Sequence, residues 1–151
     1  MDNQTRQDKI AAALLEITLP VGIEIRSWNE ADFPAIQRIS SVEGWTSPIQ
    51  RSTDALLAWR QSWPALVAVK GEMVVGFVRG LTDGAMTTYI ADLAVDQQLR
   101  GKGIGRALLD VCHFLYPTAR LDLLAEENAR EFYRACGFRS LSDGMRKSYV
   151  K

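Results

Sequence analysis

The sequence predicts a single α/β domain built around one mixed, mostly antiparallel sheet. The chain has 151 residues, the length of one ordinary domain, and 47% of them are hydrophobic. Stretches typical of strands follow one another with short turns in the middle of the chain, which favours an antiparallel meander. Helical stretches then alternate with strands toward the end of the chain, and such crossovers add parallel neighbours to a sheet.

The first half of the chain contains the signals for a helix, a strand, two further helices and a hairpin. Residues 1–7 are polar and are expected to be loose. Asn29 can cap a helix, as can Ser52 or Thr53 after a loop at 43–48. The elements expected in this half are, in order, a helix at 8–17, a strand at 23–28, helices at 30–42 and 54–63, and strands at 65–70 and 72–81 joined through Gly71.

The second half continues with strands and helices in alternation. The Asp-Gly dipeptide at 83–84 is a strong turn signal. Further along the chain, Pro117 marks the end of the preceding helical stretch. The elements expected here are a strand at 87–95, a helix at 104–115, a strand at 119–125, a helix at 127–137, and short closing strands at 138–140 and 145–150.

Composition excludes several classes of function. Lys plus Arg equals Asp plus Glu, at 18 each, which argues against a nucleic-acid-binding protein. The two cysteines and the single histidine do not form a metal-binding pattern, so we expect no metal and two reduced thiols. No apolar run reaches the length of a membrane span, and the N-terminus lacks a signal-peptide pattern. A cytoplasmic protein without membrane partners is therefore expected.

The most informative stretch is "LRGKGIG" at residues 99–105, directly before a helix. Glycines at a helix start let backbone N–H groups approach a ligand, often a phosphate. The stretch fits neither the G-x-G-x-x-G dinucleotide pattern nor the G-x-x-x-x-G-K-[ST] P-loop in any register. A glycine-rich turn without a ligand is the alternative interpretation of these residues alone.

Two longer segments resemble the GNAT superfamily of N-acetyltransferases. "DLAVDQQLRGKGIGRALL" (92–109) resembles the main motif of that family, with its R-x-x-G-x-G loop, and "ENAREFYRACGF" (127–138) resembles its second motif. The resemblance implies a GNAT-like domain over residues 22–151, with helices on both faces of the sheet. Residues 1–21 would be a partly helical N-terminal extension.

The resemblance implies acetyl-CoA as the cosubstrate. Its pyrophosphate would meet the glycine loop and its pantetheine arm would follow the preceding strand, while Asn128 would contact the arm or its surroundings. Capping of the following helix is the alternative role of Asn128. The expected cofactor contacts are Leu93, Ala94, Val95, Arg100, Gly101, Lys102, Gly103, Ile104, Gly105, Arg106, Asn128 and Tyr133.

The catalytic candidates are Tyr133 and Asp92. Acetyl transfer to an amine needs a neutral amine, a polarised thioester carbonyl and a proton for the departing thiolate. The resemblance implies that Tyr133 supplies this proton, although it could also be a core residue. Asp92 interrupts an apolar strand, where a carboxylate is costly unless it is paired or faces a polar cleft. It could be a base, a relay, an anchor or a structural group, and Ala91 before it disfavours direct proton abstraction.

Candidates for the acceptor site come from the loop between the first two helices of the expected domain. Glu43 and Trp45 pair a carboxylate with an aromatic ring, which suits an ammonium group. The alternative is that Trp45 is a buried core residue and Glu43 a solvated surface charge. Arg79 could bind an acidic group of the substrate or neutralise Asp92.

The predicted function is transfer of an acetyl group from acetyl-CoA to a primary amine of a small molecule, within a ternary complex. The alternatives are a non-catalytic acyl-CoA-binding module and a protein N-acetyltransferase. The sequence is compatible with a homodimer, and it does not identify the acceptor amine.

Overall fold

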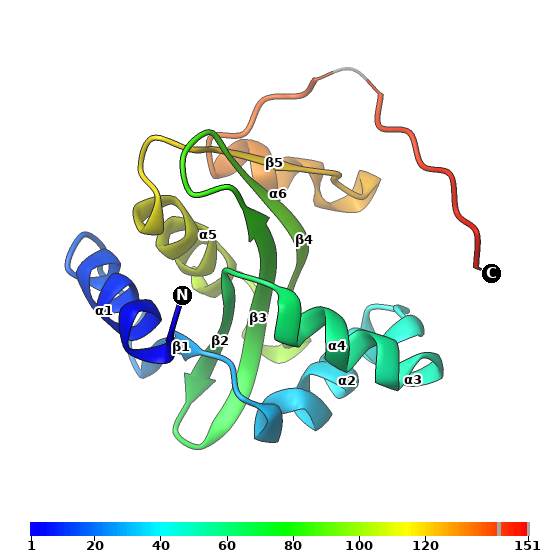
Figure 1. The fold of residues 1–151 in the computed structure, drawn as a ribbon, viewed down its shortest axis with the longest axis horizontal. Helices are drawn as coiled ribbons and strands as arrows, with labels where there is room; N and C mark the ends of the chain where they lie inside the picture. The colour runs from blue at the N-terminus through cyan, green and yellow to red at the C-terminus, as the bar shows by residue number, and fades with distance from the viewer. Residues whose placement is uncertain (142, 151) are drawn as a thin grey trace.

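The structure is a computed structural model, and it describes residues 1–141 and 143–150. At its centre, the described residues form a five-stranded sheet whose strands lie side by side in chain order (Figure 1). The first four strands pair antiparallel, and the fifth pairs parallel with the fourth, which confirms the predicted mixed sheet. The strands are β1 (Ile23–Ser27), β2 (Ala65–Lys70), β3 (Met73–Thr82), β4 (Thr87–Val95) and β5 (Arg120–Leu123).

Helices cover both faces of this sheet, as the sequence predicted (Figure 1). One face carries the first and fifth helices, which pack against each other, and the opposite face carries the second and fourth. The helices are α1 (Asn3–Leu14), α2 (Phe33–Val42), α3 (Ser47–Gln50), α4 (Ser52–Gln61), α5 (Ile104–Leu115) and α6 (Arg130–Ala135), with 3-10 turns at Glu30–Asp32, Gln97–Leu99 and Glu127–Ala129.

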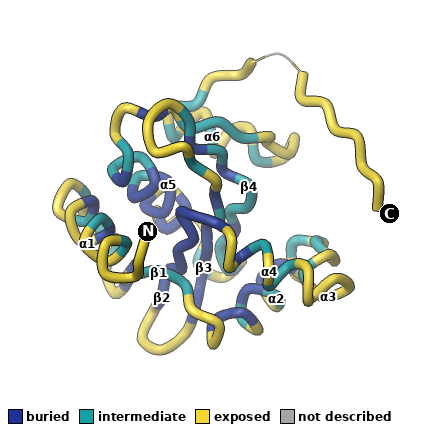
Figure 2. The backbone as a smooth tube through the Cα atoms, viewed as in Figure 1, coloured by how far each residue is buried: buried dark blue, intermediate teal, exposed yellow. Residues whose placement is uncertain are grey.

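Two apolar cores hold the helices to the sheet, and the strands between them are the most buried part of the chain (Figure 2). On one face, α5 buries Leu108 and Val111, and α1 adds Ile10. On the other face, Ile36 of α2 and Trp59 of α4 pack in a second cluster. Burial of such side chains contributes about 1.5–3 kcal/mol each, so the sheet is a firm support for the loops at its ends.

The N-terminus differs from the prediction. Residues 1–7 were expected to be loose, but α1 already begins at Asn3. The cause is local, since the Asp2 side chain accepts a hydrogen bond of 2.8 Å from the backbone N–H of Thr5 and caps the helix. This helix ends at Leu14, and its packing on α5 makes it part of the folded structure.

The helices after residue 42 also differ in detail from the sequence prediction. The expected loop at 43–48 ends in the short helix α3, which begins at Ser47. Neither Ser52 nor Thr53 caps α4, because Ser52 is already its first residue and Arg51 stands at the cap position without a side-chain bond. The helix therefore depends on tertiary packing rather than on a side-chain cap.

The predicted closing strands at 138–140 and 145–150 are wrong. The described residues after α6 form no strand, and they run along the outside of the domain to the C-terminus (Figure 1). Phe138 is half-buried, but residues 139–141 and 143–150 are exposed, with Met145 at 94%. A strand-like composition forms a strand only where a neighbouring strand supplies backbone partners, and among the described residues no strand pairs with this segment.

The pairing of β4 changes halfway along the strand. Toward β3, Arg79 faces Asp92 while the next residue, Gly80, faces Ile90, so that Ala91 is the extra residue of a β-bulge. Toward β5, the pairing covers only the first part of β4 and ends at Ile90↔Leu123. Beyond this point the two parallel strands separate, and the part of β4 that carries the predicted site residues borders a cavity.

Candidate active site

The site is a cleft of about 1190 Å³ at the separated end of β4 and β5. The loop after α2, the bulged half of β4, the glycine loop before α5 and the segment leading into α6 form its walls. Every residue predicted for catalysis, cofactor contact or acceptor binding lines this cleft, except Lys102, which lies on the exposed outside of the loop. The position agrees with the general preference of α/β sheets to bind ligands at the carboxyl ends of strands.

The glycine loop leaves the first turn of α5 open toward the cleft. Gly101 and Gly103 have φ angles of +76° and +88°, a backbone conformation that other residues adopt only with strain. Gly103 stands at the cap position of α5, where no side chain bonds the first backbone N–H groups. These groups and the positive end of the helix dipole form a site for an anion.

Gly105 has a different role from Gly103. It lies in the first turn of α5, and a Cβ atom there would come within 3.0 Å of the Phe132 ring of α6. Its small size therefore lets α5 and α6 approach each other beside the cleft. The sequence predicts that both glycines allow close approach of a ligand. The structure adds a second role for Gly105, which is to make room for the Phe132 ring.

Tyr133 lies half-buried on α6 at the wall of the cleft. The rings of Phe132 and Phe138 meet it edge-on, with centroid distances of 5.1 and 5.5 Å. Burial raises the pKa of Tyr133 to about 12, and the nearby Cys136 and Glu126 act in the same direction. The phenol is therefore protonated throughout the neutral range, as a proton donor requires.

Asp92 is paired with an arginine inside the cleft. Arg79 Nε donates to Asp92 Oδ2 at 2.6 Å, and Arg79 Nη1 donates to Ser62 Oγ at 3.2 Å. The two side chains belong to neighbouring strands, and the bulge at Ala91 sets the register in which they face each other. The sequence left open whether Arg79 binds substrate or neutralises Asp92, and the observed contact is with Asp92.

Two contacts tie the loop after α2 to the far wall of the cleft. Glu43 forms an ion pair with Arg100 of the glycine loop. Trp45 Nε1 donates to Glu126 Oε1 at 3.1 Å, across 81 positions of sequence. The loop after α2 therefore contacts both the glycine loop and the segment that follows β5.

Glu126 lines the cleft but is not among the site residues predicted from the sequence. This exposed residue follows β5 and precedes the turn Glu127–Ala129, in which Asn128 also lines the cleft. One signal could have indicated it, since a charged residue just after a parallel strand lies where such sheets bind ligands. Ser62, the partner of Arg79, gave no such signal.

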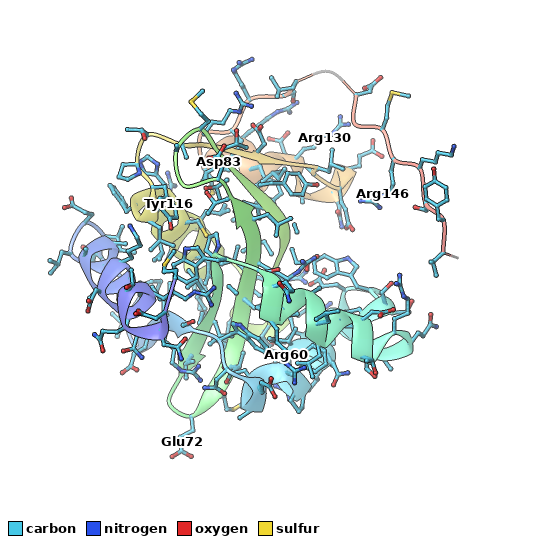
Figure 3. All side chains as sticks on the ribbon, in the orientation of Figure 1. Arg60, Glu72, Asp83, Tyr116, Arg130 and Arg146 are labelled. Carbon is cyan, nitrogen blue, oxygen red and sulfur yellow. The ribbon has the colours of Figure 1, made fainter. Side chains whose placement is uncertain are left out.

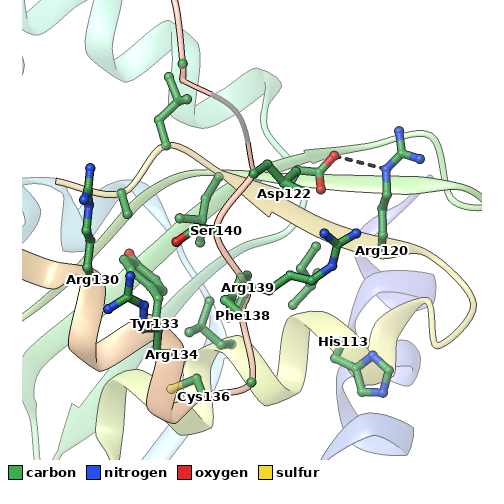
Figure 4. Close-up of a pocket in the computed structure, with 18 of the residues that line it drawn as sticks. His113, Arg120, Asp122, Arg130, Tyr133, Arg134, Cys136, Phe138, Arg139 and Ser140 are labelled. Atoms are coloured by element: carbon green, nitrogen blue, oxygen red, sulfur yellow. Dashed lines mark hydrogen bonds and ion pairs between the residues drawn. The ribbon is translucent and has the colours of Figure 1, made fainter. Parts of the chain in front are cut away.

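A second cavity, of about 1120 Å³, lies between α5, β5, α6 and the C-terminal segment (Figure 4). Arginines dominate its charged lining, and two of them, Arg130 on α6 and Arg146 on the C-terminal segment, are labelled in Figure 3. Arg120 on its β5 side is paired with Asp122 at 3.0 Å. Of the predicted site residues, Tyr133 alone borders both cavities. Among the described residues there is no group of three potential metal ligands and no helix long and apolar enough to cross a bilayer.

The chain matches one family of known proteins. The sequence profile of the acetyltransferase (GNAT) domain matches residues 61–140, which include β2 to β5, the glycine loop and α6. A search of curated protein sequences gives no significant match. The chain belongs to the GNAT acetyltransferase family and is therefore an acyltransferase.

Solved structures agree with this assignment. A GNAT family acetyltransferase from Streptococcus pneumoniae is 25% identical, with a TM-score of 0.65 over 85% of this chain and 96% of that chain. The Ard1 structure from Thermoplasma volcanium is 27% identical, with a TM-score of 0.63 over 81% and 86% of the two chains. An aminoglycoside acetyltransferase from an uncultured soil sample shares the fold at 20% identity, with a TM-score of 0.64 over 86% and 97%.

Proposed function

We propose that this protein transfers an acetyl group from acetyl-CoA to a primary amine of a small molecule, by direct attack in a ternary complex. The observation that carries the proposal is the convergence of three chemical elements on one cleft. These elements are an open helix N-terminus for an anion, a protonated tyrosine, and carboxylates beside an aromatic ring. The family supplies the reaction class, and the cleft supports the choice of donor and acceptor.

The residues around the glycine loop fit acetyl-CoA as the donor. The uncapped N–H groups of α5 and the neighbouring Arg100 and Arg106 suit its pyrophosphate. The half of β4 that has separated from β5, including Leu93, Ala94 and Val95, offers backbone groups for the amides of the pantetheine arm. This arrangement would direct the thioester along β4 toward Tyr133.

The chemical step assigns a different task to each polar group. The neutral amine attacks the thioester carbonyl, and the carbon–sulfur bond breaks. Tyr133 gives its proton to the departing thiolate, the attacking nitrogen loses a proton to solvent water, and the phenolate regains a proton from solvent. Asp92 acts as an anchor in the wall rather than as the direct base, because its charge is already matched by Arg79. This assignment agrees with the presence of alanine at position 91.

The contacts across the cleft favour a small acceptor over a polypeptide. Glu43–Arg100 and Trp45–Glu126 join the two walls, whereas an extended peptide needs an uninterrupted groove. Glu43 and Trp45 belong to the proposed acceptor side, and both lie within side-chain contact of the cofactor side. A small amine can reach the space between them.

A release assay tests the proposal. The purified protein is mixed with acetyl-CoA and, in turn, with polyamines, arylalkylamines, amino acids, aminosugars and aminoglycosides, and free thiol is measured over time. We expect amine-dependent thiol release with at least one of these classes. Release that no amine accelerates would contradict the proposal.

A further inference from the structure

The cleft contains four carboxylates, and their pairing distinguishes one of them. Each of three carboxylates forms an ion pair with an arginine: Glu43 with Arg100, Asp54 with Arg51, and Asp92 with Arg79. The fourth, Glu126, forms no ion pair among the described residues. Among the residues that the structure describes, its side chain takes part in one hydrogen bond, which Oε1 accepts from the neutral Trp45 indole. Among the described residues, Glu126 is therefore the cleft carboxylate that has no cation in ion-pair contact.

The position of Glu126 suits contact with an acceptor. It follows the end of β5 at Leu123 and lines the same cleft as the bulged half of β4 and Tyr133. The two residues are close enough for the Glu126 charge to contribute to the raised pKa of the phenol. Glu126 is thus near the proposed proton donor without occupying the glycine loop.

Trp45 completes the environment of this carboxylate. Its indole N–H holds Oε1 at 3.1 Å and leaves Oε2 without a recorded partner among the described residues. Trp45 is itself half-buried in the wall of the cleft. An ammonium group is attracted both by a carboxylate oxygen and by the face of an indole ring, so this pair matches the cationic form of a primary amine.

We propose that Glu126, oriented by Trp45, is the residue that binds the ammonium group of the acceptor, before the attacking nitrogen gives a proton to solvent water and reacts as the neutral amine. The inference rests on the proposed function and names the site through which the enzyme selects cationic amines. It also separates the roles of the cleft carboxylates. Glu43 and Asp92 hold the walls through their arginines, while Glu126 meets the substrate.

The test compares Glu126→Gln with Glu127→Gln. The first substitution keeps the size and the acceptor oxygen for Trp45 but removes the charge, and the second removes a neighbouring exposed charge that does not line the cleft. Rates are measured with spermidine, 2-phenylethylamine and kanamycin as acceptors. For each amine that the wild type acetylates, Glu126→Gln should raise KM about fivefold or more, since a hydrogen bond to a charged group is lost. Glu127→Gln should leave KM within about twofold of wild type, since an isolated surface charge contributes little.

Further measurements separate a loss of amine binding from a loss of folding or of acetyl-CoA binding. The affinity for acetyl-CoA and the melting temperature should be unchanged in Glu126→Gln, and Glu126→Asp should restore part of the lost affinity for the amine. Equal KM values for wild type and Glu126→Gln would overturn this inference and leave the proposed function intact. A lower kcat with unchanged KM would also overturn it, because the residue would then act in the chemical step. Absence of amine acetylation by the wild type would instead overturn the proposed function, and this inference with it.

Discussion

The Tyr133 side chain packs against the hydrophobic core and also lines the cleft. Its ring packs between Phe132 and Phe138, and its burial keeps the phenol protonated far above neutral pH. The same burial links the residue to stability. Because the folded protein raises its pKa from about 10 to about 12, the folded state loses stability as pH rises across that interval.

Replacement of Tyr133 by phenylalanine tests its role as a proton donor. Only the hydroxyl is lost, so the packing and the affinity for acetyl-CoA should be retained. We expect kcat to fall by about 100-fold or more, as is typical when general acid catalysis is removed. In the wild type, kcat should show no descending limb between pH 7 and 10, because the phenol stays protonated there. A loss of less than threefold would assign Tyr133 to packing alone.

The Asp92–Arg79 pair gives a second prediction. Asp92→Asn leaves the Arg79 guanidinium, which is only 20% exposed, without its charged partner. We expect a lower melting temperature, corresponding to about 1–3 kcal/mol, together with a higher KM for the amine and unchanged affinity for acetyl-CoA. Asp54→Asn is the matched control, because its pair with Arg51 is more exposed and should contribute little. If the ascending limb of kcat/KM with pH disappears in Asp92→Asn, the residue is the base and our assignment as an anchor is wrong.

At the scale of elements, the glycine loop and the first turn of α5 form the part of the cleft that suits an anion. Gly103→Glu would place a carboxylate beside the uncapped N–H groups, and repulsion should abolish acetyl-CoA binding in calorimetry. Gly71→Glu is the control. Gly71 also has a positive φ, +62°, and lies in the hairpin between β2 and β3, outside the cleft, so the backbone cost is similar. A folded Gly103→Glu variant with normal affinity would contradict the assignment of the loop.

The elements that the sequence predicted well are those with local signals. Asn29 forms the expected cap, as part of a capping box with Asp32, the turn at Asp83 joins β3 to β4, and α5 follows the glycine loop at the expected residue. The predicted closing strands failed because a strand needs a pairing partner, which residues 145–150 cannot specify by themselves. The site residues divide in the same way, into those that a local sequence motif indicates and those that only the tertiary fold brings together. Tyr133 and Gly103 belong to contiguous motifs, whereas the Trp45–Glu126 contact joins residues 81 positions apart and arises only from the tertiary fold.

At the scale of the whole molecule, the sheet supports a cleft whose two walls come from distant parts of the chain. The wall from the first half carries Glu43 and Trp45, and the wall from the second half carries the glycine loop and Tyr133. The bulge in β4 and the separation of β4 from β5 open the space between these walls. The β-sheet with its two cores thus places the two walls, which we propose as the donor and acceptor sides, within reach of each other.

The central claim is that both sides act together in one transfer reaction. The most direct test supplies acetyl-CoA with an isotopically labelled acetyl group, together with the amine panel, and measures released thiol and labelled amide by mass spectrometry. We predict equal amounts of thiol and amide with the wild type, and neither product above background with Gly103→Glu. If the wild type binds acetyl-CoA but releases thiol at the same rate with and without amines, and no labelled amide forms, the account is contradicted.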